Sequence, residues 1–337
     1  MATNGKQPCL PLASAVTTIG RRLIDQTKAF CETHVPGSEV IYGDSVAAYT
    51  PVWVRTLEGK IDLCAIEGVA ARYGVVEGWR KCVDEKGRET KEACEMVRGV
   101  ETWSEEGWTR LTRVVRHVLA PHKRMVRVVT PSGYVDVTDD HSLLTPDGES
   151  ISPRDAEKGT PLMHSRGPPR GDERTTTNEG SASRVLRAKE EGAWCAVGVP
   201  IDPTRGVPDD VLDGDERVVR AFWDGFAGSR EVLRFDNLPH VGRARIAWLA
   251  QRMGYDVHFW PRNGRDTTAC VAHRRRVSVP SWSRRPREVV RVDPLEHELG
   301  CPVYDLTTEN HHFAAGVGNI VVHNTDSVMW NLSLIHI

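Results

Sequence analysis

Residues 303–325 read VYDLTTENHHFAAGVGNIVVHNT and carry the clearest structural signal in the chain. The run from Pro302 to Val322 is rich in β-forming residues and is interrupted by glycines, which is typical of short strands joined by turns. It also holds adjacent histidines at 311 and 312 and leads into His323, Asn324 and Thr325. The stretch therefore predicts β-structure that carries side chains able to react and to move protons.

The same β texture fills the region from Pro51 to Thr145. Its clearest part is Arg124–Val137, where valines on both sides of a Pro131-Ser132-Gly133 turn predict a hairpin. Directly after this hairpin comes VTDDH, in which Thr138 and His141 are three residues apart.

Apolar residues at helical spacing predict helices in Leu12–Glu32, in residues 218–226 and in residues 241–253, with Gly254 placed to end the last one. We expect short strands at Glu39–Tyr42 and Tyr255–Phe259. Two further segments predict no regular structure. Residues 165–191 lack large apolar side chains and suit an exposed linker, and the basic residues 274–287 suit a loop.

The composition is that of an ordinary globular protein. The 337 residues include 44 Lys and Arg against 46 Asp and Glu, a net charge of -2, and 39% are hydrophobic. This balance argues against a disordered chain and against a strongly basic nucleic-acid-binding protein. No apolar run reaches the roughly 18 residues of a membrane span, and the polar N-terminus does not predict a secretory signal. The eight cysteines form no C-x-x-C pair, so we expect reduced thiols in an intracellular protein rather than a zinc site.

Two short strings far apart in the sequence complete one motif. Residues 39–44 read EVIYGD and residues 325–330 read TDSVMW, and joining them gives EVIYGDTDSVMW. This resembles the YGDTDS signature of family B DNA polymerases, and Leu10–Glu32 resembles the palm helix that precedes it. The resemblance implies that Asp44 and Asp326 hold Mg²⁺ in the host polymerase. Coincidence is the weaker explanation, because the halves join in register.

The 280 residues between these strings, Ser45 to Asn324, resemble an intein, a protein insert that excises itself. The segment opens with a hydroxyl nucleophile, Ser45, and closes with His323 and Asn324 before a second hydroxyl, Thr325. Thr138 and His141 match the internal T-x-x-H motif, and Asp305 and His311 match the late motif. Residues 107–117, GWTRLTRVVRH, are also similar to inteins at this insertion point.

The resemblance implies a role for each of these residues. Ser45 attacks the Asp44 carbonyl, His141 protonates the departing amine, and Thr138 holds the scissile amide in a high-energy conformation. Thr325 then accepts the upstream segment, and Asn324 cyclises to release it, assisted by His323 and His311. Asp305 orients or activates Thr325, or supports His311. Splicing needs no cofactor.

The other histidines are expected to have ordinary structural roles. We expect His312 to be simply packed or exposed, and Asp139 and Asp140 to shape their turn. His117 and His122 are expected to be solvated. No partners are predicted for His164, His240, His258, His273 and His297.

The middle region resembles a degenerate LAGLIDADG homing endonuclease. Ala221–Arg230 is similar to one motif helix, but Ser229 stands where an acidic residue is expected, and Asp224 lies a turn too early. There is no second copy of the motif. We therefore expect an inactive remnant, with a plain helical packing insert as the alternative. The sequence leaves open whether it binds DNA, although the basic residues 274–287 could track phosphates.

The predicted fold is mainly β: a Hint-type horseshoe, interrupted by a small α+β insert and flanked by short polymerase palm fragments. Splicing is preferred over two alternatives, a nucleotidyltransferase inferred from the flanks and a DNA-cleaving homing protein.

The expected partners are DNA and deoxynucleotides, reached through the spliced host. We expect a monomeric splicing domain, no membrane, and an intracellular location in the nucleus or at a site of viral DNA replication. The chain is expected to end as a fragment, because residues 331–337 do not continue the polymerase resemblance. The predicted domains are 1–44 (polymerase), 45–163 and 288–324 (splicing domain), 164–190 (linker), 191–287 (endonuclease-like) and 325–337 (polymerase).

Overall fold

The computed structural model describes residues 39–41, 45–83, 89–121, 123–169, 182–199, 206–212, 216–261, 268–274, 286–296, 300–324 and 329–331. The contacts divide the chain into two units, which are described separately. The first holds residues 1–43, 84–88 and 325–337, and the second holds residues 44–83 and 89–324.

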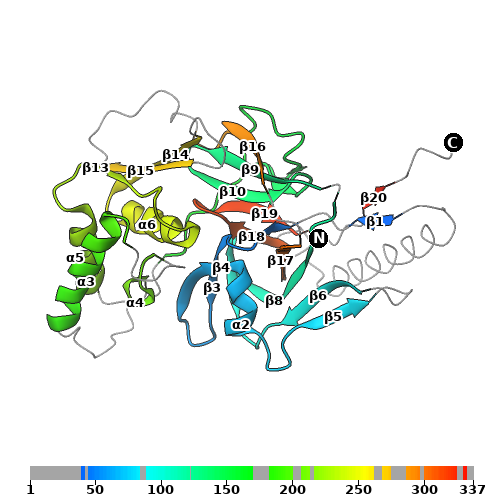
Figure 1. Ribbon diagram of the computed structural model, residues 1–337, viewed down its shortest axis with the longest axis horizontal. Helices are drawn as coiled ribbons and strands as arrows, with labels where there is room; N and C mark the ends of the chain where they lie inside the picture. The colour runs from blue at the N-terminus through cyan, green and yellow to red at the C-terminus, as the bar shows by residue number, and fades with distance from the viewer. Residues whose placement is uncertain are drawn as a thin grey trace, which may run out of the picture. The chain divides into compact units, whose positions relative to one another are not determined.

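In the first unit, strands β1 (Glu39–Ile41) and β20 (Met329–Asn331) pair antiparallel. Ile41 lies opposite Met329, so the strand ends nearest the intervening segment face each other (Figure 1). The strand predicted at Glu39–Tyr42 is confirmed over its first three residues. The helix predicted at Leu12–Glu32 lies outside the described residues.

The second unit is built mainly on one antiparallel sheet of fifteen strands within the described residues. The main path through this sheet is β12-β11-β19-β18-β3-β7-β8-β17-β2-β10-β9-β16, and β4, β5 and β6 branch from it. The expectation of a mainly β protein is therefore confirmed. The strands are β2 (Val46–Ala47), β3 (Pro51–Arg55), β4 (Ile61–Ala65), β5 (Arg80–Val83), β6 (Glu89–Glu95), β7 (Glu101–Ser104), β8 (Gly107–Val118), β9 (Met125–Thr130), β10 (Gly133–Thr138), β11 (Leu143–Leu144), β12 (Ser150–Ile151), β16 (Arg291–Leu295), β17 (Pro302–Thr308), β18 (His312–Ala315) and β19 (Ile320–His323).

The predicted hairpin is the pair β9–β10, and every residue of both strands is buried. Two of these buried residues carry charges, and they neutralise each other. Arg127 donates to both carboxylate oxygens of Asp136, at 2.7 and 2.6 Å, and Tyr49 donates to the same carboxylate at 2.8 Å. Because a buried charge is tolerated when it is paired and hydrogen-bonded, both strands of the hairpin can be buried along their full length.

The insert, the helical part between β12 and β16, carries a small sheet ordered β13-β15-β14. Figure 1 shows α6 between the large sheet and the pair α3 and α5. The two predicted helices correspond to α5 and α6, and the predicted strand at Tyr255–Phe259 is part of β14. The elements are α3 (Ala182–Ala196), α4 (Asp209–Leu212), α5 (Glu216–Ala227), β13 (Val232–Arg234), α6 (His240–Arg252), β14 (Tyr255–Pro261) and β15 (Thr268–Arg274). Before the insert, β4 leads into a 3-10 turn (Ile66–Gly68) and helix α2 (Val69–Tyr73).

The linker prediction for residues 165–191 is wrong for its last part, because α3 begins at Ala182. The segment lacks large apolar residues, but glycines let its helix approach α5 closely. A Cβ at Gly192 would lie 2.0 Å from the Phe222 carbonyl oxygen, and one at Gly225 would lie 1.9 Å from the Lys189 carbonyl oxygen. Close backbone approach thus replaces the apolar side chains that the sequence lacks. Residues 170–181 and most of the basic segment 274–287 lie outside the described residues.

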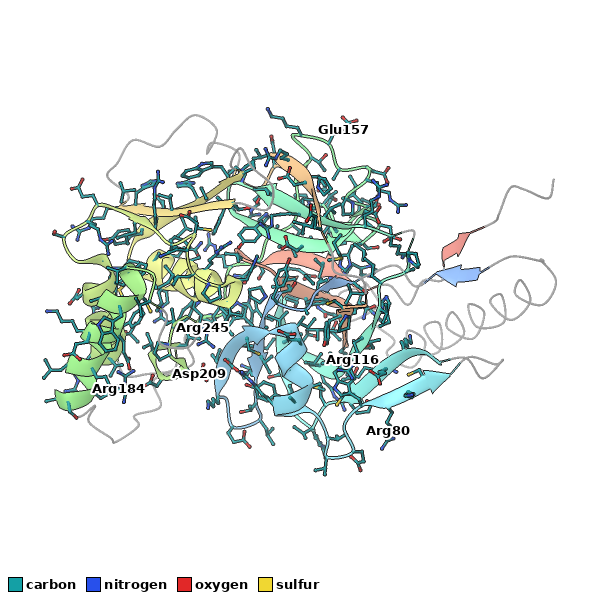
Figure 2. The ribbon with its side chains drawn as sticks, in the orientation of Figure 1. Arg80, Arg116, Glu157, Arg184, Asp209 and Arg245 are labelled. Carbon is teal, nitrogen blue, oxygen red and sulfur yellow. The ribbon has the colours of Figure 1, made fainter. Side chains whose placement is uncertain are left out.

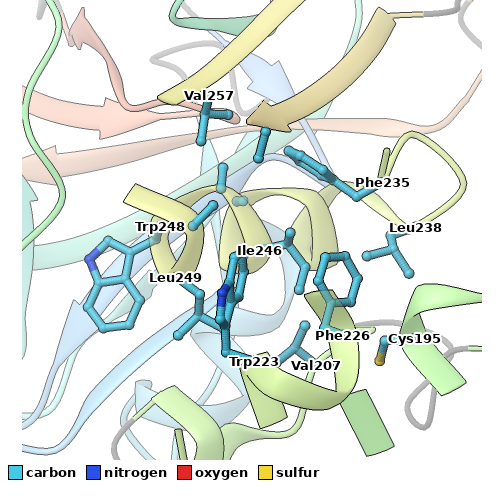
Figure 3. Close-up of a cluster of buried hydrophobic side chains, with 14 of the residues drawn as sticks. Cys195, Val207, Trp223, Phe226, Phe235, Leu238, Ile246, Trp248, Leu249 and Val257 are labelled. Atoms are coloured by element: carbon cyan, nitrogen blue, oxygen red, sulfur yellow. The ribbon is translucent and has the colours of Figure 1, made fainter. Parts of the chain in front are cut away.

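Helix α6 is buried on nearly all sides, which joins the insert to the large sheet. Trp223 and Phe226 of α5 pack near Ile246 and Leu249 of α6 (Figure 3). The same buried cluster includes residues of the large sheet, and the rings of Trp53 and Trp248 lie 5.3 Å apart. One hydrophobic core therefore runs through both parts.

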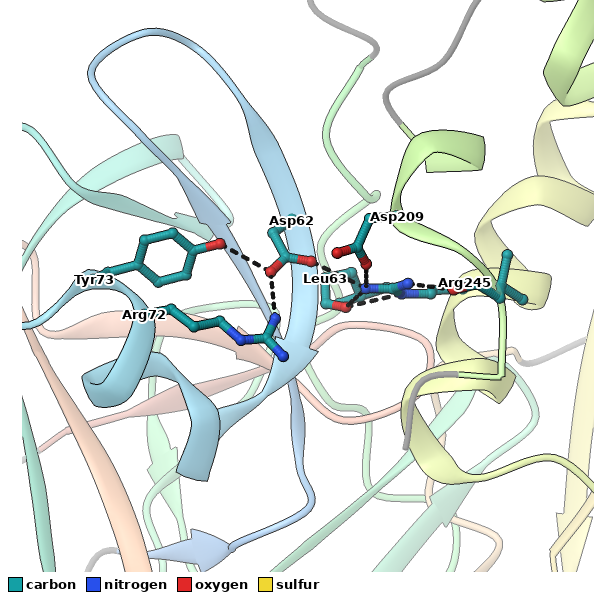
Figure 4. A network of polar contacts seen from close by, with 7 residues as sticks. Asp62, Leu63, Arg72, Tyr73, Asp209 and Arg245 are labelled. Carbon is teal, nitrogen blue, oxygen red and sulfur yellow. Dashed lines mark hydrogen bonds and ion pairs between the residues drawn. The ribbon is translucent and has the colours of Figure 1, made fainter. Parts of the chain in front are cut away.

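A buried arginine reinforces this joint. Arg245 of α6 is fully buried and donates to the Leu63 carbonyl oxygen at 2.9 and 2.6 Å and to Asp62 of β4 at 3.0 Å (Figure 4). It also bonds the Val207 carbonyl oxygen and lies 2.8 Å from an Asp209 carboxylate oxygen. Figure 2 labels Arg245 and Asp209 on the insert, close to the β3–β4 hairpin. Because the guanidinium bridges both parts, the insert and the sheet stabilise each other.

Candidate functional site

Ser45 is the first described residue of the intervening segment, and it is fully buried before β2. Thr138, at the end of β10, makes two contacts with the backbone of Ser45. The Thr138 amide donates to the Ser45 carbonyl oxygen at 2.9 Å, and the Ser45 amide lies 3.4 Å from Thr138 Oγ1. That amide nitrogen belongs to the Asp44–Ser45 bond. Among the described residues, Ser45 Oγ has no hydrogen-bond partner.

His141 is fully buried in the turn that follows β10. Its amide donates to the Thr138 carbonyl oxygen at 3.0 Å. The two aspartates of the turn are bound as the sequence led us to expect of turn-formers: Asp139 accepts from Arg154 at 2.9 Å, and Asp140 pairs with buried Lys123 at 2.7 Å. These contacts fix the loop that carries His141.

Strand β17 lies beside Ser45 on the side opposite to β10. β2 pairs with β10 through Val46 and with β17 through Tyr304 and Val46. Continuing the β17 register by one residue places Asp305 opposite Ser45. Asp305 is buried, and one of its carboxylate oxygens accepts from the Leu306 amide at 2.7 Å. The late motif therefore lies against the N-terminal end of the segment.

Asn324, the last residue of the segment, returns to the same strand. Its side-chain Nδ2 donates to the Leu306 carbonyl oxygen at 2.7 Å, and its amide donates to the His311 carbonyl oxygen at 2.7 Å. His323 donates its amide to the Ser142 carbonyl oxygen at 2.8 Å, next to His141. Both ends of the 280-residue segment thus meet on β17 and the turn after β10.

The histidines near Asn324 form a cluster. The His311 ring lies 6.5 Å from the His323 ring, and the backbone of His311 has a φ of 63°. This left-handed conformation costs a non-glycine residue about 1–3 kcal/mol and is often found at functional sites. The His312 ring lies closer to His323, at 5.1 Å, and His312 bonds the Glu105 carboxylate.

The structure brings together seven of the predicted site residues: Ser45, Thr138, His141, Asp305, His311, His323 and Asn324. Their chemical roles stay predictions. The other three, Asp44, Thr325 and Asp326, lie outside the described residues. Glu105 is a neighbour that the sequence reasoning missed, because nothing local links it to a histidine 207 positions away. His312 is neither simply packed nor exposed, but paired.

Three other histidines differ from expectation. His117 was expected to be solvated, yet burial lowers its pKa to about 4. Burial also lowers the pKa of His164 and of His240 to about 4. Both have neighbours that the sequence did not reveal: His164 Nε2 lies 3.2 Å from Thr130 Oγ1, and His240 Nδ1 lies 3.2 Å from Tyr134 Oη. The three imidazoles are therefore neutral at neutral pH.

The rings of His258 and His273 stack at 4.9 Å within the insert. His122 and His297 lie outside the described residues.

The endonuclease-like region shows exposed, separate polar groups. Asp224 of α5 and Ser229 after it are both exposed. Within the described part of the chain, no group of three His, Cys, Asp or Glu residues is arranged to hold a metal ion. In the same part of the chain, none of the helices has the length and apolar character needed to cross a membrane.

No model of a known protein family matches the chain. It is 25% identical to a DNA polymerase of Acanthamoeba polyphaga mimivirus, over 96% of this chain and 23% of that protein. It is 36% identical to a DNA polymerase of Thermococcus sp. (strain GE8), over 40% of this chain and 7% of that protein. The chain thus spans less than a quarter of these relatives. Among solved structures it is similar to the PabCDC21-1 intein, with 13% identity, a TM-score of 0.39, and coverage of 84% of this chain and 100% of that one. The similarities to DNA polymerases and to inteins are those that the motifs indicated.

Proposed function

We propose that residues 45–324 excise themselves from a family B DNA polymerase by protein splicing and join Asp44 to Thr325. The observation that carries the proposal is the meeting of the two ends of the segment on β17. Ser45 lies beside Asp305 in the strand register, and Asn324 Nδ2 donates to the adjacent Leu306 carbonyl oxygen. Two reactive groups 279 positions apart in sequence thus share one buried centre, and proximity of this kind replaces a cofactor or an energy source.

The first step exchanges an amide for an ester. Ser45 Oγ loses its proton and attacks the Asp44 carbonyl carbon, the carbon–nitrogen bond breaks, and the Ser45 nitrogen takes up one proton and leaves as an amine. The contact between the Ser45 amide and Thr138 Oγ1 supports this step, because it restrains the nitrogen that must leave. His141, on the same turn, supplies the proton that the nitrogen needs.

The remaining steps move the upstream segment and release the insert. Thr325 Oγ attacks the ester, and Ser45 Oγ leaves with a proton. Asn324 Nδ2 then attacks its own carbonyl carbon, which forms a succinimide and frees the Thr325 amine. That amine takes the acyl group from its own oxygen and leaves a normal peptide bond. His323 and His311 act as proton carriers in the release step, and Asp305 assists Thr325 or His311.

The pairing of β1 with β20 supports the proposed ligation. Removing residues 45–324 leaves seven residues between Ile41 and Met329, and Thr325 stands in the middle of them. The strands thus already have the register of a hairpin whose turn would contain Asp44 and Asp326. In the spliced host we propose that this turn binds Mg²⁺ and serves DNA synthesis from deoxynucleotides in the nucleus or at a viral replication site.

We propose that the insert is an inactive endonuclease remnant and that the splicing segment acts as a monomer. The exposure of Asp224 and the presence of a serine at position 229 support the first point, because two-metal cleavage needs convergent carboxylates. A nicking assay with Mg²⁺ on the polymerase gene that lacks the insert tests it. Cleavage at the insertion site would refute the proposal that the insert is inactive.

Intact-mass spectrometry of the purified chain tests splicing. We expect a free 280-residue segment and a ligated product of 57 residues. Asn324→Ala should abolish release of residues 325–337, because alanine has no amide nitrogen to cyclise. Asn237→Ala, at an exposed position of the insert, is the control and should splice like the parent chain. A folded parent chain that stays intact would contradict the proposal.

A further inference from the structure

The turn between β7 and β8 places Glu105 beside His312 of β18. Glu105 Oε1 bonds His312 Nδ1, and only 20% and 24% of the two side chains are exposed. Burial raises the pKa of Glu105, but the hydrogen bonds from His312 and from the Glu105 backbone, with electrostatic interactions with His312 and His323, outweigh it and hold the pKa below its usual value. The carboxylate is therefore ionised at neutral pH. Because an ionised carboxylate only accepts hydrogen bonds, His312 Nδ1 carries the hydrogen.

His312 in turn contacts His323. The two residues are directly opposite in the β18–β19 register, and their ring centroids lie 5.1 Å apart at 70°. Opposed residues of an antiparallel pair have close Cβ atoms, so their side chains restrict each other. His311, the neighbour that matches the late motif, has its ring farther from His323, at 6.5 Å. His312 is thus the nearer imidazole.

A second hydrogen bond holds the β7–β8 turn to this segment. Asn310 Nδ2 donates to Ser104 Oγ at 3.1 Å, and Asn310 Oδ1 accepts from the His312 amide at 3.3 Å. Asn310 thus links Ser104, the residue before Glu105, to the backbone of His312. The Glu105 carboxylate has a defined position relative to His323, which directly precedes Asn324.

We propose that Glu105 and His312 are positioning residues for the release step at Asn324. The Glu105 carboxylate fixes the His312 ring, and His312 fixes the imidazole of His323 beside the asparagine. In this proposal both residues act through His323 and not on the reacting atoms themselves. Among the described residues, the groups that face His323 include His311, which directly precedes β18, His312 of β18, Glu105 of the β7–β8 turn and the Ser142 backbone. The inference rests on the proposed splicing function.

Release can be measured alone in a Ser45→Ala chain, which cannot form the ester but keeps Asn324. In this chain, Glu105→Gln should slow the release of residues 325–337 by about 10- to 100-fold, the loss expected from a misplaced group. Glu105→Asp should restore most of the rate. Glu106→Gln removes the same charge at the exposed neighbouring position and should release like the parent. An unchanged rate in Glu105→Gln would overturn the proposal.

Two further comparisons separate positioning from general damage. His312→Gln should slow release as much as Glu105→Gln does, and the double variant should be no slower, because both act through one contact. Ester formation should not change. It is read in an Asn324→Ala chain as hydroxylamine-induced cleavage before Ser45. Equal slowing of ester formation and release would overturn the proposal.

Imidazole nitrogen NMR spectra test the contact without any splicing. In the Asn324→Ala chain, Glu105→Gln should shift the ring signals of both His312 and His323, and Glu106→Gln should shift neither. If the ring signal of His323 does not shift in Glu105→Gln, the proposal is overturned. If the parent releases nothing while His323 still responds, splicing fails as the function and the positioning contact stands.

Discussion

Replacing the buried Arg245 with alanine should destabilise the insert and the large sheet together. The change removes hydrogen bonds to the carbonyl oxygens of Leu63 and Val207 and to Asp62, as well as the ion pair with Asp209. Removing one partner of a buried charged network typically costs about 3–5 kcal/mol. An unsatisfied buried carbonyl costs about 1–3 kcal/mol by itself. Since Asp62 keeps Arg72 and Tyr73 at 2.9 Å each, its charge stays paired. The cost is therefore set by the carbonyl oxygens of Leu63 and Val207, which lose their buried donor, and we expect a loss of about 2–6 kcal/mol in the free energy of unfolding.

Urea unfolding followed by tryptophan fluorescence measures this loss, in a Ser45→Ala, Asn324→Ala chain that cannot react. Trp53 and Trp248 report on the joint from its two sides. The parent should unfold in one transition, because one buried hydrophobic cluster contains residues of both parts. The control is Arg220→Ala, which removes an exposed helix pair with Glu216 and should cost less than about 1 kcal/mol. A loss below about 1 kcal/mol for Arg245→Ala, or a parent in which the insert unfolds separately, would refute the reasoning.

Three other predictions concern the site, the acid stability and the helix contact. Thr138→Val should slow hydroxylamine-induced cleavage before Ser45 about tenfold in an Asn324→Ala chain, since one hydrogen bond is lost, whereas Thr138→Ser should keep the rate. The free energy of unfolding should fall as the pH drops from about 6.5 towards 4. In this range the three buried histidines, with a pKa of about 4, stay neutral in the folded chain, whereas the same histidines bind protons in the unfolded chain. Urea titrations across this range measure it, and a free energy of unfolding that stays constant would contradict the prediction. Gly225→Ala should cost about 1–3 kcal/mol by the same urea assay, because its Cβ would meet the Lys189 carbonyl, while Gly68→Ala, with no contact nearer than 3.8 Å, should cost little. Equal costs for the two glycines would argue against close packing of α3 on α5.

Local patterns in the sequence predicted the β elements well. The β9–β10 hairpin is encoded by its own turn and valines, so its signal does not depend on distant residues. Helices α5 and α6 are encoded by apolar spacing in the same way. The site followed from short motifs, because Thr138, His141 and Asn324 each sit in a recognisable string. What the motifs could not give is the geometry that joins these strings, which depends on long-range strand pairing.

The features that the sequence did not reveal depend on long-range packing. Helix α3 looked like a linker, because its packing uses Gly192 and the facing Gly225 rather than large side chains. The sequence around Arg245 gave no indication of its burial, and only the fold places it between Leu63 and Val207. The contact between Glu105 and His312 joins residues 207 positions apart. No local pattern reports such partners.

The peptide bond that splicing would create is the most direct test of the account. Proteolysis of the short product from the parent chain, followed by tandem mass spectrometry, reads the sequence across the junction. The account predicts fragment ions in which Tyr42-Gly43-Asp44 continues directly into Thr325-Asp326-Ser327. Recovery of only separate peptides that end at Asp44 and begin at Thr325, or of an uncut chain that is folded, would contradict it.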